Sequence, residues 1–158
     1  RDYKVTGVQT CALPISVLRR DMYTKVLVPM ALDHGVSSHT LGIANALRSS
    51  GGEIIALHVH EAPQGSVSAY LDEATVAAGF DKARAELEDK LSDHPDVTPV
   101  IVKGHSSRTI IDYAASQGVD CIVIGSHKPG LSDYFLGSTA SRVVRHAGCA
   151  VHVHRAPS

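Results

Sequence analysis

The chain predicts an α/β domain, in which a parallel sheet of five strands carries helices on both faces. Two observations predict this class. After residue 22, short β-branched runs alternate with helical patterns, as in a series of strand–helix–strand units. A stretch rich in glycine and hydroxyl residues then follows the fourth predicted strand, where such sheets bind ligands. The length of 158 residues, with 44% apolar and 20% charged side chains, is ordinary for one globular domain.

The first half of the chain contains two predicted strands and two predicted helices. Residues 25–30 form a short β-branched strand that stops around Pro29. Apolar residues near helical spacing predict a helix over 37–50, which the glycines at 51 and 52 end. A buried strand is expected at 53–60. After a loop at 63–69, a long amphipathic helix at 72–92 places acidic residues early and basic residues late, which matches the helix dipole.

The second half repeats the alternation. Residues 97–102 predict a strand at the edge of the sheet, because Pro99 cannot donate to a hydrogen-bond ladder. Ser106 or Ser107 is expected to cap a helix that runs to residue 117. Further strands are predicted at 119–124 and 150–154, with a helix at 137–147 between them.

The stretch from Gly125 to Thr139 is the most informative for function. Gly125 ends a strand and Gly137 opens a helix, so backbone can approach a ligand there without a Cβ in the way. The free N–H groups and dipole of the helix start favour an anion, and hydroxyls follow at Ser138 and Thr139. Ser126, His127 and Lys128 flank this position, and two of them can add positive charge. The arrangement suits nucleotide phosphates, although neither a Walker A loop nor G-x-G-x-x-G is present. The alternative is a tight turn that binds nothing.

The same stretch resembles the nucleotide loop of the universal stress protein family, whose usual form is G-x2-G-x9-G-[S/T]. Residues 26–29 resemble the first strand of that family, 57–59 its second strand, and 145–151 its last helix-to-strand passage. The likeness extends from about residue 22 to residue 155. Lys128 replaces the second glycine, and the loop to Gly137 is one residue shorter than usual. The form G-x-x-K-P resembles a bacterial branch of the family that is associated with ATP.

This resemblance implies the sheet order 3-2-1-4-5 and a binding site beyond the carboxyl ends of the first and fourth strands. It places Pro29 by the adenine or ribose and the backbone of Val59 at the adenine. The family usually has an aspartate two residues after that proline, where this chain has Ala31. Asp33 either takes over the ribose role or is only a turn or cap residue. The residues assigned to nucleotide binding are Pro29, Ala31, Asp33, Val59, Ile124, Gly125, Ser126, His127, Lys128, Gly137, Ser138 and Thr139.

The resemblance also implies a homodimer, in which the last strand pairs with its copy in a second subunit. An exposed β-branched edge strand is normally paired or blunted, which agrees with this expectation. A tetramer is a further alternative. The residues assigned to the dimer interface are Val151, His152, Val153 and His154.

Several other classes of function are disfavoured by the sequence. No basic cluster or aromatic platform points to nucleic acid, and the apolar runs are far shorter than a membrane span. Histidine pairs at 58 and 60 and at 152 and 154 would meet at a metal only if their strands were neighbours, which the implied order excludes. Cys121 and Cys149 are expected to be buried and reduced, as in a cytoplasmic protein.

Three functions compete at this stage. The first is an ATP-binding, dimeric stress-response module, with Mg²⁺ held through the phosphates. The second is an enzyme that slowly hydrolyses ATP or phosphorylates itself, but Asp33 and His127 have no orienting partner visible in the sequence, so no catalytic residue is assigned. The third is a nucleotide-free scaffold with a vestigial pocket, consistent with Lys128 and Ala31.

Residues 1–21 stand apart from the rest of the chain. Residues 2–16 resemble a translated sequencing-library adapter, and they lack the uninterrupted apolar core of a signal peptide. We therefore expect residues 1–21 to be a non-native extension and residues 22–156 to form the universal stress protein domain, with Met22 as the native start. The alternative is a natural disordered arm.

Overall fold

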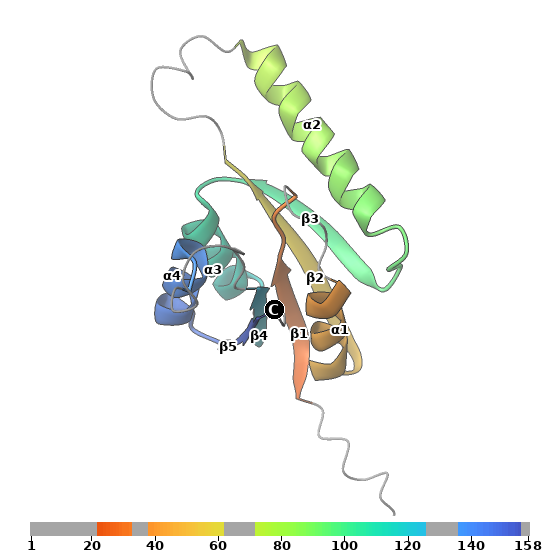
Figure 1. The fold of residues 1–158 in the computed structure, drawn as a ribbon, viewed down its shortest axis with the longest axis vertical. Helices are drawn as coiled ribbons and strands as arrows, with labels where there is room; N and C mark the ends of the chain where they lie inside the picture. Colours follow the sequence, from red (N-terminus) through yellow and green to blue (C-terminus); the bar gives the residue numbers. More distant parts are fainter. Residues whose placement is uncertain (1–21, 33–37, 62–71, 126–135, 156–158) are drawn as a thin grey trace, which may run out of the picture.

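A computed structural model describes residues 22–32, 38–61, 72–125 and 136–155, in which strands and helices alternate as the sequence predicts (Figure 1). All strand pairs are parallel, and the sheet has the order β3-β2-β1-β4-β5, which confirms the predicted fold. The strands are β1 (Tyr23–Pro29), β2 (Arg48–His60), β3 (Val97–Lys103), β4 (Cys121–Gly125) and β5 (Ala150–His154). The helices are α1 (Ser38–Leu47), α2 (Glu73–Lys90), α3 (Ser106–Ser116) and α4 (Ser138–His146).

The two faces of the sheet bury two separate apolar clusters, because successive side chains of a strand point to opposite faces. On β1, Val26 and Val28 are buried against α1 and α2, while Leu27 is buried against α3 and α4. The helices thus cover the sheet in pairs, with α1 and α2 on one side and α3 and α4 on the other (Figure 1). The first cluster also contains Leu41, Ala44 and Leu87, and the second contains Ile110, Ala140 and Val143.

The start of β2 differs from the expected boundary. The sequence predicts a helix end at the two glycines and a strand from residue 53, but α1 ends at Leu47 and β2 already begins at Arg48. Tyr23 pairs with Arg48 and Lys25 pairs with Glu53, so the extra residues of β2 bulge out between these two pairs. Gly51 takes a positive φ of 78°, which a glycine adopts without strain. The glycines therefore form a bulge inside the strand rather than its boundary.

The edge position predicted for β3 is confirmed, whereas the predicted cap of α3 is not. β3 is an edge strand, as Pro99 predicts. The predicted cap of α3 by Ser106 or Ser107 is wrong, since the N-cap residue is His105 and its side chain makes no capping bond. Instead, the Glu61 carboxylate accepts a hydrogen bond of 2.5 Å from the backbone N–H of Ser106. The hydrogen bonds from Ser106 lower the pKa of Glu61, which keeps this carboxylate charged at the positive end of the helix.

Asp120 directly precedes β4 and bonds to the beginning of β1. It therefore lies at the amino ends of these strands, whereas the predicted site lies at their carboxyl ends. Its carboxylate accepts hydrogen bonds from the backbone N–H groups of Thr24, at 2.6 Å, and Lys25, at 3.1 Å, and from the Thr24 hydroxyl. These bonds, chiefly those from Thr24, lower the pKa of Asp120. A carboxyl with a lowered pKa stabilises the fold above its unfolded pKa and loses that contribution as the pH falls through its folded pKa.

We expect Asp120→Asn to lower the free energy of unfolding at pH 7 by about 1–2 kcal/mol, since charge-assisted bonds are replaced by weaker ones. The difference from the parent protein should shrink as the pH falls below the ordinary aspartate pKa of about 4 and toward the lower pKa of Asp120 in the folded protein. Urea unfolding at several pH values measures both effects. Asp81→Asn on the exposed face of α2 is the matched control. An equal loss in both variants, or a difference that grows in acid, would contradict this role.

Candidate functional site

The predicted site lies at the carboxyl ends of β1 and β4, which are neighbours at the point where the strand order reverses. Pro29 is the last residue of β1 and Gly125 is the last residue of β4. Val26 pairs with Cys121 and Leu27 with Ile122, so the two strands run side by side two residues before Pro29 and Ile124. β1 then leads to a helix on one face of the sheet and β4 to a helix on the other (Figure 1). The two chain segments separate here, which is the condition for a ligand crevice in this architecture.

Gly125 lies at the carboxyl end of β4, where three elements meet. It is exposed and pairs with His154 of β5. A Cβ added to Gly125 would lie 3.9 Å from the Thr40 hydroxyl oxygen in the first turn of α1. The end of β4, the start of α1 and the end of β5 therefore meet, and Gly125 leaves the backbone accessible between them.

Within the described residues, the first backbone N–H groups of α4 have no hydrogen-bond acceptor. Gly137 is the N-cap residue, and no described residue beyond its chain neighbours has an atom within 4 Å of the position that its Cβ would occupy. The Ser141 N–H bonds to the Gly137 carbonyl at 2.8 Å, which is the first intrahelical bond. The N–H groups of Ser138, Thr139 and Ala140 precede it and have no intrahelical acceptor. Ser138 is exposed and Thr139 is half-buried, so their hydroxyls stand beside these N–H groups.

The helix starts of α2 and α3 differ from that of α4, because each is occupied by a carboxylate of the chain itself. Asp72 caps α2 by accepting a bond of 2.7 Å from the Thr75 N–H, and Glu61 accepts the Ser106 N–H of α3. Gly137 has no side chain to do the same for α4, and no side-chain bond caps it in the described residues. Among these three helices, the start of α4 is thus the one that leaves its positive end to an external anion.

Val59 is placed so that its backbone polar groups point toward the β1 side of β2, beyond the end of β1. The Leu57 carbonyl accepts a bond of 2.9 Å from the Met30 N–H on the β1 side, whereas the His60 carbonyl accepts one of 3.2 Å from Gly104 on the β3 side. Because backbone groups alternate in direction along a strand, those of Val59 point to the β1 side. The pairing of β1 with β2 ends at Pro29 and Leu57, so β1 offers Val59 no partner residue. The Val59 side chain is buried, which fixes this orientation.

The segment that follows β1 is held by two side chains that the sequence analysis did not assign to the site. The Nδ1 atom of His58 lies 3.0 Å from the Met30 carbonyl oxygen, and the Lys90 ammonium of α2 donates to the Leu32 carbonyl. Lys90 also pairs with Glu86 at 2.7 Å. Ala31 is exposed between the two anchored carbonyls. Lys90 is 58 residues from Leu32 in sequence, so only the packing of α2 on the sheet reveals the contact.

We expect Lys90→Met to lower the free energy of unfolding by about 1–2 kcal/mol, because the Leu32 carbonyl loses a charged donor while the aliphatic stem is kept. The crevice beside Ala31 should also lose order, which amide hydrogen exchange of residues 30–32 reports. Lys82→Met on the exposed face of the same helix controls for the loss of a positive charge. Unchanged exchange at these residues would show that Lys90 does not hold the segment.

The remaining predicted residues divide into two groups. Asp33, Ser126, His127 and Lys128 lie outside the described residues, so their roles stay predictions. On β5, Val151 and Val153 pack on the cluster beneath α3 and α4, while the His154 ring stacks on His39 of α1 on the other face, with centroids 5.9 Å apart. β5 is the outer strand of the described sheet, as predicted.

Three further observations concern the possible metal ligands, a buried cysteine and the helices in the part of the chain that the structure describes. No three side chains of His, Cys, Asp or Glu there lie close enough to share a metal ion. Burial raises the pKa of Cys121 to about 11, so its thiol stays protonated and unreactive near neutral pH. None of the described helices combines the length and apolar character that a membrane crossing requires.

The sequence and the structure of this chain are similar to those of known proteins. The sequence matches the family model described as "Universal stress protein family" over residues 22–155. Universal stress protein G of Shigella flexneri is 32% identical over 143 residues, which cover 85% of this chain and 100% of that protein. The structure of hypothetical protein MJ0577 is 26% identical with a TM-score of 0.71, covering 87% and 99% of the two chains. UspA from Lactobacillus plantarum is 29% identical with a TM-score of 0.57, covering 84% and 98%.

Two more distant structures of the same fold contain adenine nucleotides. The universal stress protein from Archaeoglobus fulgidus in complex with dAMP has a TM-score of 0.52 and covers 84% of this chain and 98% of that one. A family protein from Arabidopsis thaliana with AMP bound has a TM-score of 0.54, with 85% and 93% covered. Both are 18% identical to this chain, so the likeness establishes a common fold.

Proposed function

Since this chain belongs to the universal stress protein family, we propose that it binds an adenine nucleotide, ATP with Mg²⁺, in the crevice between the ends of β1 and β4. The observation that carries this proposal is the start of α4, which no side chain of the described residues caps and which has open space at the Cβ position of Gly137. The distant relatives that hold AMP and dAMP support the adenine nucleotide class.

The phosphates are assigned to the start of α4. The N–H groups of Ser138, Thr139 and Ala140 supply donors, and the helix dipole supplies a positive potential that no carboxylate of the described residues caps. The hydroxyls of Ser138 and Thr139 add donors, and Gly125 and Gly137 leave room for close approach. Mg²⁺ would be held mainly by the phosphate oxygens, as is usual for this ion. Lys128 is proposed to add a positive charge near the phosphates, and its contribution to ATP affinity should fall when salt is raised.

The adenine and ribose are assigned to the β1 side of the crevice. The backbone groups of Val59 point there beyond the end of β1, which suits hydrogen bonds to an adenine edge. Pro29 ends β1 and Ile124 is the residue before the last of β4, and both would contact the base or sugar. Ala31 has no polar side chain for the ribose hydroxyls, and Asp33, two residues further on, is proposed to supply one.

The proposed activity is binding with dimerisation through β5 rather than efficient ATP hydrolysis. The carboxylates with lowered pKa in the described residues are Glu61, Asp72, Glu86 and Asp120, and hydrogen bonds within the fold account for each shift. None of them belongs to the predicted nucleotide residues, so none is poised as a general base at the site. Slow turnover or self-phosphorylation remains the second candidate, through Asp33 or His127.

Calorimetric titration with ATP and Mg²⁺ tests the proposal, after acid extraction has established whether purified protein retains nucleotide. Binding at micromolar ATP, or retained nucleotide, is the expected result. Neither retention nor binding would favour the nucleotide-free scaffold. Phosphate release measured with enzyme in excess over ATP then separates binding from hydrolysis, since a binding module leaves the bound ATP intact over many minutes.

A further inference from the structure

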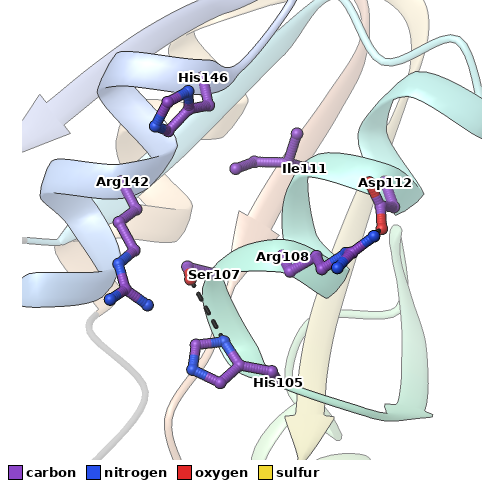
Figure 2. A pocket seen from close by; sticks show the side chains of 7 residues that line it. All are labelled: His105, Ser107, Arg108, Ile111, Asp112, Arg142 and His146. Carbon is purple, nitrogen blue, oxygen red and sulfur yellow. Dashed lines mark hydrogen bonds and ion pairs between the residues drawn. The ribbon is translucent and has the colours of Figure 1, made fainter.

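A hollow of about 540 Å³ lies between α3 and α4, on the side of these helices away from the sheet (Figure 2). Its volume falls within the range of small-molecule sites. Ile111, which packs partly on the apolar core, contributes the apolar lining. None of its lining residues belongs to the set assigned above to nucleotide binding. The hollow therefore needs its own explanation.

Positive charge and imidazole groups surround this hollow. Arg142 and His146 lie four residues apart on α4, so they share one face of that helix. Opposite them, α3 contributes Arg108 and the residue before the helix, His105. The lining contains one carboxylate, Asp112, and it pairs with Arg108 at 3.6 Å. No ion pair within the described chain involves Arg142, so its charge is available to a ligand.

The hydrogen-bond donors approach the hollow from both helices. Figure 2 shows the Arg142 side chain extending from α4 toward Ser107 and His105, whereas Arg108 turns toward Asp112. The Ser107 side chain is only 3% exposed, and its hydroxyl oxygen lies 3.3 Å from Nδ1 of His105. This contact fixes the serine hydroxyl and the imidazole relative to each other. A guanidinium from one side thus faces a positioned hydroxyl–imidazole pair on the other.

We infer that the α3–α4 hollow binds the phosphate group of a phosphorylated small molecule. A phosphate monoester carries three acceptor oxygens around a tetrahedral centre, so it can accept from Arg142 and from the pair of Ser107 and His105, whereas His146 lies toward the other end of the hollow (Figure 2). A planar carboxylate offers fewer acceptor oxygens and a single charge, so it would bind more weakly beside the Arg142 guanidinium. Ile111 provides an apolar surface for the carbon part of the molecule. This inference does not depend on the nucleotide site.

The test uses inorganic phosphate as the probe and follows the histidine ring and backbone amide signals of the full chain by NMR. We expect saturable shifts at His105, His146 and Ser107, with an affinity that falls when salt is raised. Arg142→Gln should weaken phosphate binding about tenfold, because it removes a charge-assisted donor from an exposed helix position. Arg145→Gln is the matched control, since it removes the same charge from the same helix outside the hollow.

Further comparisons separate this site from the start of α4 and from unselective anion binding. In Gly137→Val, phosphate should still shift the signals of His105 and His146, and acetate at equal concentration should bind more weakly than phosphate. The inference is overturned if no saturation is seen, if Arg142→Gln and Arg145→Gln weaken binding equally, or if Gly137→Val abolishes these shifts. A protein that binds ATP but fails this test would leave the nucleotide proposal intact.

Discussion

Replacing Gly137 by valine should lower the affinity for ATP at least tenfold, which corresponds to about 1.4 kcal/mol of binding free energy. The new side chain would stand where the phosphates must approach the first N–H groups of α4. The substitution should leave the fold intact, because no described residue beyond its chain neighbours lies within 4 Å of the Cβ position, and the φ of −49° and ψ of 154° suit any residue. Calorimetric titration with ATP and Mg²⁺ measures the effect.

Gly148→Val provides the matched control for this prediction. Gly148 lies just after the other end of α4 and also has open space around its Cβ position. The same substitution at the opposite end of the helix should leave the ATP affinity unchanged. If Gly137→Val bound ATP as tightly as the parent protein, the start of α4 would not be the phosphate site. Equal losses in both variants would point to a general disturbance of the helix.

Replacing Val153 by proline should convert the proposed dimer into a monomer. The Ala150 N–H donates to the Asp120 carbonyl at 3.2 Å, so Ala150 and His152 direct their backbone groups toward β4. Val153 therefore directs its N–H to the free edge of the sheet, where a second copy of β5 would pair. Proline removes that donor and spares the bonds to β4. Light scattering should show twice the chain mass for the parent protein and the single chain mass for the variant.

His152→Pro distinguishes loss of the edge from loss of the strand. His152 pairs with Val123 inside the sheet, so its replacement by proline should disrupt the β4–β5 ladder and lower thermal stability as well. Val153→Pro should be a monomer whose thermal stability is that of a single folded subunit, because its bonds to β4 are kept. A parent protein that is monomeric at all concentrations, or a Val153→Pro variant that remains dimeric, would rule out this interface.

Much of the fold could be predicted because local patterns and long-range packing agree. The strand at 150–154 has its predicted bounds, and Pro99 correctly marked an edge strand. The start of β2 was missed because a glycine pair commonly ends a helix, and only the pairing of Tyr23 with Arg48 shows that it forms a bulge. The cap of α3 was also misassigned, since Glu61 lies 45 residues away from the helix that it caps.

The candidate site could be predicted where it depends on backbone and glycine positions. Gly125 and Gly137 lie where the strand order and the loop pattern indicated, at the end of β4 and the start of α4. The supporting contacts of Lys90 and His58 with the segment after β1 could not be read from the sequence, because they depend on how α2 and β2 pack. The hollow between α3 and α4 has the same origin, since its charged residues come from two helices that meet only in the fold.

The central claim is that the start of α4 and the end of β4 receive the phosphates of a bound adenine nucleotide. Backbone amide NMR of the parent protein during titration with ATP and Mg²⁺ tests this claim most directly. The account predicts that the largest shifts occur at the amides of Gly125, Ser138, Thr139 and Ala140, while the carboxylate-capped start of α3 at Ser106 changes little. ATP binding that leaves the α4 amides unchanged, or that moves the start of α3 most, would contradict it.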